Sequence, residues 1–277
     1  TPGQYTFILP ATGEVPKRLM HPKKRTVGVR IPEHPVVHAL LAELGEPLRR
    51  LYGDRDLLTS LALTAGYFDD LDPAKTALVV VDMQNGFMKH EVAHSPCAMA
   101  HEIVPNINRL AEAVRATGGA VVWIQTAFTD ETLTSWSTLY RMVGTKGAER
   151  RRRSLAVDSP GYKLFPDLDV LPQDLIVEKK RYSAFIQGSS DLAAQLRQRG
   201  LDTVLITGTM TNVCCESSAR DAMMLNFRAI MVSDGNASLT DAEHAASLNN
   251  FLIFFGDVMT TDEAAARLVP AEQRKTA

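Results

Sequence analysis

Cysteine is scarce in this chain of 277 residues, which contains only Cys97, Cys214 and Cys215. Three cysteines make no disulfide framework, and the neighbours Cys214 and Cys215 are poorly placed to pair with each other. A reducing, cytoplasmic setting is therefore expected. The sequence also lacks an apolar run long enough to span a bilayer and a basic, apolar signal peptide, so no membrane partner is expected.

An excess of charge of one sign is lacking as well. Lys and Arg number 30, Asp and Glu number 32, and the formal net charge is −2. This balance gives no reason to expect nucleic acid as a partner. Hydrophobic residues make up 45% of the chain and charged residues 22%, a composition typical of a globular protein with a substantial core.

Strand-like and helix-like patterns alternate from Lys75 onward. Short apolar segments predict buried strands over 76–81, 120–124, 175–177, 203–207 and 229–232. Helical patterns cover 103–116, 190–200 and 215–226, and capping boxes that begin at Thr240 and Thr260 predict two more helices. Repeated units of this kind predict an α/β fold, a doubly wound parallel sheet with helices on both faces, in a domain over 71–277.

Two segments do not follow this rhythm. Residues 1–70 are predicted to form a small N-terminal appendage and linker, with strands over 5–9 and 26–30, a helix over 34–44 and a connection over 57–72. Residues 125–173 are predicted to be a long irregular insertion near the ligand. Its run Arg150–Arg153 favours a solvated face or a partner contact over a substrate clamp.

Three reactive side chains fall at the carboxyl edge of the predicted sheet, where ligands bind in doubly wound folds. Asp82 ends the first strand, Lys179 ends the third, and Cys214 follows the fourth. The lysine and the start of the next helix are expected to lower the pKa of the Cys214 thiol. Each residue also has a simpler interpretation: a turn cap, a solvated lysine, and a small apolar cysteine packed at a junction.

The segment His90–His94 matches the HExxH zinc signature, which requires both histidines on one face of a helix. Ser95 and Pro96 follow at once, and no helical pattern surrounds the match. We therefore interpret it as accidental and expect no metal site there.

Three segments, 80–87, 179–185 and 208–221, resemble the signature motifs of the isochorismatase-like cysteine hydrolases. The resemblance covers about 74–270. It implies that Asp82 is the general base and acid, Lys179 its electrostatic partner and Cys214, rather than Cys215, the nucleophile. It also implies a cis peptide before Met210, with the Met210 and Cys214 amides as the oxyanion hole. A homo-oligomer that acts on a small-molecule substrate is expected.

Departures from the family patterns narrow this expectation. Nicotinamidases of the superfamily carry metal-binding histidines after the second strand, but 125–130 contains none, which implies no metal or other cofactor. True isochorismatases typically lack the cysteine, so Cys214 favours C–N bond hydrolysis, as in the ureido and N-carbamoyl amidohydrolases. Phe128, Tyr182 and Phe185 are candidates for the pocket wall. The alternatives are a vinyl ether hydrolase of the isochorismatase type and a non-catalytic binding protein that retains the fold.

The N-terminal segment has a resemblance of its own, over about 4–48, to the threonylcarbamoyl-AMP synthase family. A fragment of this length would lack most of that fold. The absence of an initiator methionine suits a segment that starts inside a longer parent. We interpret it as a structural appendage or fusion remnant and carry over no activity. Carbamoyl-adenylate chemistry in this segment is the competing interpretation, and it predicts ATP binding.

Overall fold

The computed structural model describes residues 6–10, 26–30, 67–68 and 71–268. The chain divides into two compact units, Thr1–Ala65 and Gly66–Ala277. In the described part of the chain, no helix has the length and apolar character that crossing a membrane requires.

The first unit contains a two-stranded antiparallel sheet. Its strands are β1 (Thr6–Pro10) and β2 (Thr26–Arg30), and Thr6 lies opposite Arg30. The two strands expected in this segment are therefore confirmed. The helix expected over 34–44 and most of the connection over 57–72 lie outside the described residues.

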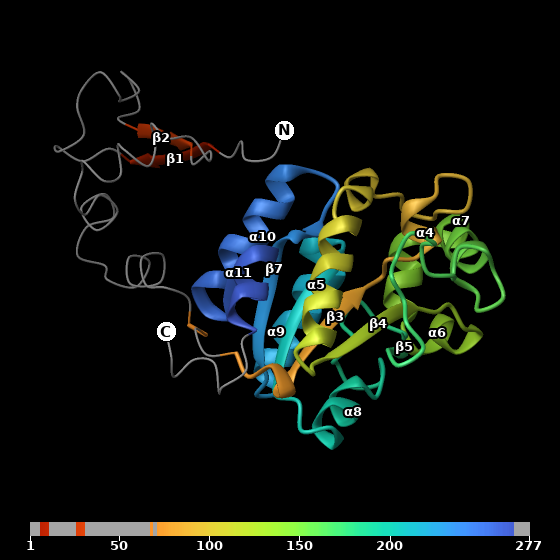
Figure 1. Cartoon of the computed structure of the whole chain (residues 1–277). Coiled ribbons are helices and arrows are strands. Elements are labelled where there is room, and N and C mark those ends of the chain that lie inside the picture. Colours follow the sequence, from red (N-terminus) through yellow and green to blue (C-terminus); the bar gives the residue numbers. More distant parts are fainter. Residues whose placement is uncertain (1–5, 11–25, 31–66, 69–70, 269–277) are drawn as a thin grey trace, which may run out of the picture. The chain divides into compact units, whose positions relative to one another are not determined.

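The second unit is built on a sheet of six parallel strands, ordered β5-β4-β3-β6-β7-β8 (Figure 1). The strands are β3 (Thr76–Val81), β4 (Ala120–Thr126), β5 (Leu175–Lys179), β6 (Thr203–Thr209), β7 (Arg228–Ala237) and β8 (Asp257–Met259). The first three strands extend the sheet from β3 toward one edge, and the chain then crosses back to begin β6 on the other side of β3. The strand order thus reverses between β3 and β6, which is where ligands bind in doubly wound sheets.

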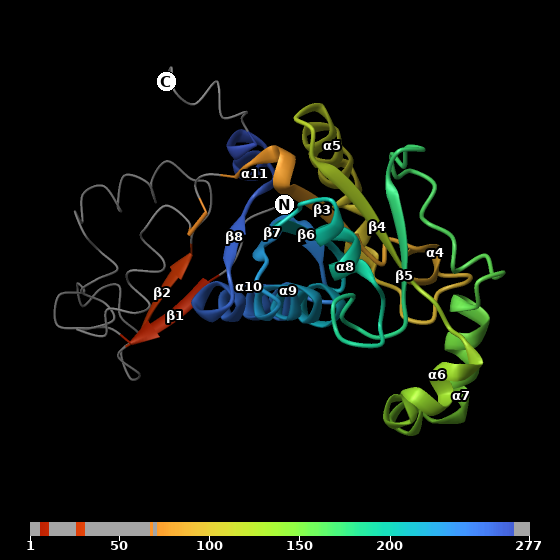
Figure 2. The same ribbon diagram turned by 90° about the horizontal axis from the view of Figure 1, so that it is seen from below.

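Helices cover both faces of this sheet (Figure 2). One face carries α5 (Val104–Ala116) and α11 (Thr261–Arg267), and the other carries α8 (Leu192–Gln198), α9 (Glu216–Met224) and α10 (Asp241–Phe254). Alternate residues of β3 enter the two cores, because successive side chains of a strand point to opposite faces. Leu78 and Val80 pack in one core, while Val79 and Val81 pack in the other. The predicted doubly wound α/β fold is confirmed.

Caps and short helices complete the unit. The hydroxyl groups of Thr240 and Thr260 accept hydrogen bonds from the amides of Glu243 and Glu263, as the two capping boxes predict. Short helical turns are η2 (Pro73–Lys75), α4 (Asn85–Met88) and η3 (Ala98–His101).

The structure corrects the prediction of an irregular insertion over 125–173. Two helices form there, α6 (Asp130–Ser135) and α7 (Ser137–Leu155), and both views place them to one side of the sheet, past β5. Few residues of helix α7 are buried, and its sequence has no continuous apolar stripe. The helical period of apolar residues therefore cannot be recognised there. Strand β8 was not predicted either, since its three residues are too few to show a pattern.

Candidate active site

Four neighbouring strands bring the candidate site together at their carboxyl ends. Lys179 ends β5, Thr126 ends β4, Asp82 follows β3 directly, and Cys214 lies in the turn after β6. The strand order β5-β4-β3-β6 therefore places these residues side by side. Thr126 was not predicted, because β4 extends two residues beyond the apolar run that indicated it.

The charged pair at the centre of the site is fully buried. The Lys179 Nζ lies 2.9 Å from Oδ2 of Asp82, and both side chains have 0% exposure. Lys179 also donates to Thr126 Oγ1 (2.5 Å) and to the carbonyl oxygen of Arg181 (3.0 Å), while the Thr126 hydroxyl donates to Asp82 Oδ1 at 2.8 Å. These contacts offset part of the cost of burying two charges in a protein interior.

Cys214 lies next to this pair, but burial reverses the expected direction of its pKa shift. Desolvation raises the pKa of the thiol to about 12; the charge of Lys179 opposes this rise, and the charge of Asp82 adds to it. The prediction of a lowered pKa is therefore wrong for the resting site, since it weighed the cation and the helix start without the burial. For Lys179, burial alone would lower the pKa, but the charges of Asp82 and Cys214 outweigh it and the pKa is raised.

The turn after β6 fixes the position of the thiol. The peptide between Thr209 and Met210 is cis, as the family resemblance implies. One turn of π-helix, η4 (Thr211–Cys215), then leads into α9. Cys215 is fully buried, and its sulfur lies 3.9 Å from the carbonyl oxygen of Thr207. Of the two adjacent cysteines, the cavity described next is lined by Cys214 alone.

A cavity of about 240 Å³ opens beside Cys214. Met210 and Tyr182 line it, so the cavity contains both oxyanion-hole candidates and one of the three predicted wall residues. This volume is below the ~300–1,000 Å³ of typical ligand pockets, so the cavity suits only a small molecule.

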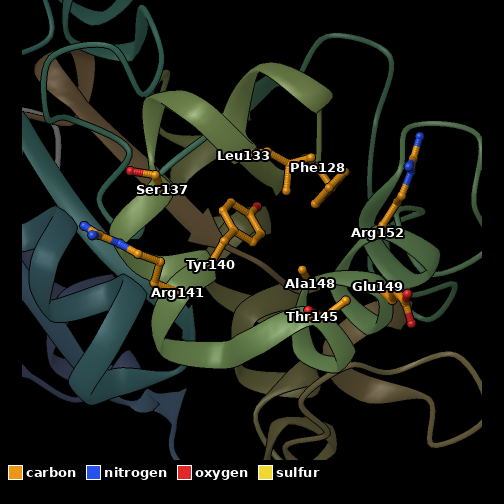
Figure 3. A pocket seen from close by; sticks show the side chains of 9 residues that line it. All are labelled: Phe128, Leu133, Ser137, Tyr140, Arg141, Thr145, Ala148, Glu149 and Arg152. Atoms are coloured by element: carbon orange, nitrogen blue, oxygen red, sulfur yellow. The ribbon is translucent and has the colours of Figure 1, made fainter.

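The other two predicted wall residues, Phe128 and Phe185, lie elsewhere. Phe185 packs in the core, with its ring centroid 5.6 Å from that of Phe227. Phe128 lines a separate hollow between α6 and α7, edge-on to Tyr140 (Figure 3). Neither residue therefore lines the cavity beside Cys214, because closeness to a motif in the sequence does not determine the direction in which an aromatic side chain points.

For three residues of the cavity, the sequence analysis predicted a different environment from the one in the structure. Arg150 and Arg151 of α7 line it, although the arginine run was expected to face solvent or a partner. His94, assigned to a chance HExxH match, is buried there, while His90 is exposed. Residues 90–94 form turns and a bend rather than the helix that the zinc signature requires. No group of three His, Cys, Asp or Glu side chains within the described ranges is placed to hold a metal.

Comparison with known proteins agrees with this geometry. The family model described as Isochorismatase domain matches residues 76–263. A second model, described as Telomere recombination and covering the Sua5, YciO and YrdC proteins, matches residues 1–86, in agreement with the resemblance found in the N-terminal segment.

Individual relatives agree with the first match. The ureidoacrylate amidohydrolase RutB of Variovorax paradoxus (strain S110) is 32% identical over 222 residues, which cover 73% of this chain and 84% of that protein. The crystal structure of a cysteine hydrolase from Pseudomonas syringae pv. phaseolicola 1448A is 30% identical, with a TM-score of 0.66 over 74% of this chain and 98% of that one. N-carbamoylsarcosine amidase from Thermoplasma acidophilum is 27% identical, with a TM-score of 0.55 and coverage of 68% and 97%. By domain match, sequence identity and fold, this chain belongs to the isochorismatase family.

Proposed function

We propose that this chain is a metal-independent cysteine amidohydrolase, which cleaves a C–N bond of a small amide, ureido or N-carbamoyl compound. The observation that carries the proposal is the buried Asp82–Lys179 pair beside the Cys214 thiol at the wall of a small cavity. The relatives named ureidoacrylate amidohydrolase and N-carbamoylsarcosine amidase support the choice of bond.

Acylation begins from a thiol, because burial holds the pKa of Cys214 high. Asp82 takes the thiol proton as the sulfur bonds to the substrate carbonyl carbon. Lys179 stays charged and compensates the buried carboxylate, which keeps Asp82 available as a base. The amides of Met210 and Cys214 stabilise the oxyanion of the tetrahedral intermediate.

The C–N bond then breaks, and the leaving nitrogen takes the proton that Asp82 holds. A thioester between the acyl group and Cys214 remains. Water attacks this thioester while Asp82 accepts one of its protons, and the C–S bond breaks to release the acid. The sulfur recovers the proton from Asp82, so the enzyme returns to its starting state.

The two alternatives fit the geometry less well. Vinyl ether hydrolysis needs no thiol nucleophile, so it leaves Cys214 at the cavity wall unexplained. A non-catalytic binding protein would carry a charged pair whose burial costs several kcal/mol of desolvation without using its chemistry.

Ammonia release from a panel of ureido acids, N-carbamoyl amino acids, biuret and nicotinamide tests the proposal. We expect Cys214→Ala to reduce kcat about 1,000-fold or more. Cys215→Ala is the matched control and should largely retain turnover, because its sulfur points away from the cavity. An acyl adduct on Cys214, detected by mass spectrometry with a slow substrate, completes the test. Equal loss in both variants, or neither ammonia nor adduct from any compound, contradicts the proposal.

A further inference from the structure

The cavity beside Cys214 is locally positive. Arg150, Arg151 and Arg181 line it, and none of its lining residues is Asp or Glu. The buried Asp82 carboxylate next to Cys214 is paired with Lys179. The whole chain has a formal charge of −2, so this positive charge does not reflect a basic protein. Charges of one sign around a cavity attract ligands of the opposite sign. The cavity is therefore suited to an anionic ligand.

These three arginines also differ from several other arginines of the protein in their ion pairs. Other arginines form ion pairs with carboxylates: Arg109, Arg115, Arg152 and Arg220. As far as the structure describes the chain, Arg150, Arg151 and Arg181 form none. Arg181 donates instead to the carbonyl oxygens of Lys180 (2.9 Å) and Ser135 (3.0 Å). Lys180 and, to a smaller extent, the charge of Arg181 lower the pKa of the nearby Glu131 carboxyl.

Arg151 has the most specific environment of the three. Its Nη1 lies 3.2 Å from Nε2 of His94, and its buried Nε has no partner among the described residues. Burial and then the charge of Arg151 lower the pKa of His94 to about 3, so the imidazole is neutral at ordinary pH. Nε2 of His94 therefore accepts from Arg151, and Nδ1–H faces Ser154 Oγ at 3.4 Å. His94 orients the guanidinium without neutralising its charge.

We propose that Arg151, positioned by neutral His94, binds a carboxylate of the substrate, so that the enzyme selects small acids that also carry the scissile amide or ureido group. A guanidinium presents parallel N–H donors that match the two oxygens of a carboxylate. Arg150 and Arg181 add positive charge on the same cavity wall. The assignment of this group to a substrate rests on the proposed hydrolase function.

Helix α7 explains how this site arises. Val143, Gly147, Arg150 and Arg151 all line the cavity. The backbone of Gly144 is not helical (φ +67°, ψ 176°), so Val143 precedes a kink in α7 and the other three residues follow it. Gly147 lies three residues before Arg150 and four before Arg151, so it neighbours both arginines on the helix surface. The same helix thus supplies an apolar wall at one end and the charged groups at the other. An anchored carboxylate would orient the rest of the substrate toward the thiol, since both line a cavity of only about 240 Å³.

Calorimetric titration of the Cys214→Ala variant separates binding from chemistry. The probes are N-carbamoylglycine and its neutral analogue N-carbamoylglycinamide, which differ only in the carboxylate. The acid should bind on the order of 10- to 100-fold more tightly than the amide, as expected for hydrogen bonds between charged groups. Adding Arg151→Met should abolish this preference, while adding Arg152→Met, at an exposed arginine paired with Asp130, should preserve it.

Kinetics of the enzyme with Cys214 intact provide a second measurement. Arg151→Met should raise the KM of the acid with little change in kcat, and should leave the amide unaffected. If neither compound releases ammonia, the proposed function is contradicted. An acid preference that depends on Arg151 in the titration would still support the carboxylate site.

Three outcomes of the titration overturn the carboxylate site: equal binding of acid and amide, binding of neither compound, or the same loss of preference in Arg151→Met and Arg152→Met.

Discussion

Burial decides the chemistry of single residues in this site. Asp82 and Lys179 have no exposed surface, and Cys214 is buried beside them. The lysine charge opposes the desolvation of the thiol but does not overcome it, so the resting nucleophile is protonated. Asp82 therefore has to take the thiol proton during the attack, because no thiolate has formed beforehand.

The Asp82–Lys179 pair gives a prediction at this scale. Lys179→Met leaves the buried carboxylate unpaired and should lower the free energy of unfolding by about 3–5 kcal/mol, with loss of turnover. The double variant Asp82→Asn/Lys179→Met should recover much of the stability but no activity, because it removes both charges together. Urea unfolding and ammonia release measure the two effects.

Lys180→Met is the control for this experiment. Its ammonium is partly exposed and pairs with Glu131 at 2.7 Å, so the change should cost no more than about 1 kcal/mol and preserve turnover. Inactivation by Lys180→Met but not by Lys179→Met would show that Lys180, rather than Lys179, has the catalytic role.

The turn between β6 and α9 is the structural element on which the nucleophile depends. Gly208 pairs with Val81 across the junction of β6 and β3, and its φ is +114°. A Cβ at this position would lie 2.0 Å from the carbonyl oxygen of Val81. The close approach of the two strands, directly beside Asp82, therefore requires glycine for two independent reasons.

Gly208→Ala should accordingly cost roughly 4 kcal/mol or more and reduce turnover even in the fraction that folds. Gly200→Ala is the matched control: Gly200 follows α8 with φ +72°, but a Cβ there meets nothing within 4 Å. Its cost should be about 1 kcal/mol, from the left-handed backbone alone. Thermal unfolding of the two variants compares them, and similar melting temperatures would show that the contact with Val81 is unimportant.

At the scale of the whole molecule, the strand order assembles the site. Lys179, Thr126, Asp82 and Cys214 come from positions spread over more than 130 residues, yet β5, β4, β3 and β6 are neighbours. The sheet, both helical layers and the cavity all belong to the unit Gly66–Ala277. The matched isochorismatase domain, residues 76–263, lies within the same unit.

We therefore predict that a chain beginning at Gly66 folds and retains the turnover of the full chain within about threefold. Circular dichroism, thermal unfolding and ammonia release compare the two proteins. If the shortened chain is insoluble or inactive while the full chain is active, residues 1–65 contribute to the stability or to the site of the second unit.

The sequence alone determined the sheet and the reactive residues at its edge. Apolar β-branched runs mark strands through their own composition, and strand–helix alternation then makes the strands parallel, with their carboxyl ends at one edge. Asp82, Lys179 and Cys214 could be placed there because each follows such a run directly. These inferences needed only local pattern and chain direction.

Only the tertiary structure decided which other side chains join them. His94 and Arg151 are 57 residues apart and meet through the packing of a turn against α7, a helix without an apolar stripe. The positions of Phe128 and Phe185 depend in the same way on which face of the fold each segment packs against. The direction of the Cys214 pKa shift depends on desolvation, which is set by everything packed around the thiol rather than by its sequence neighbours.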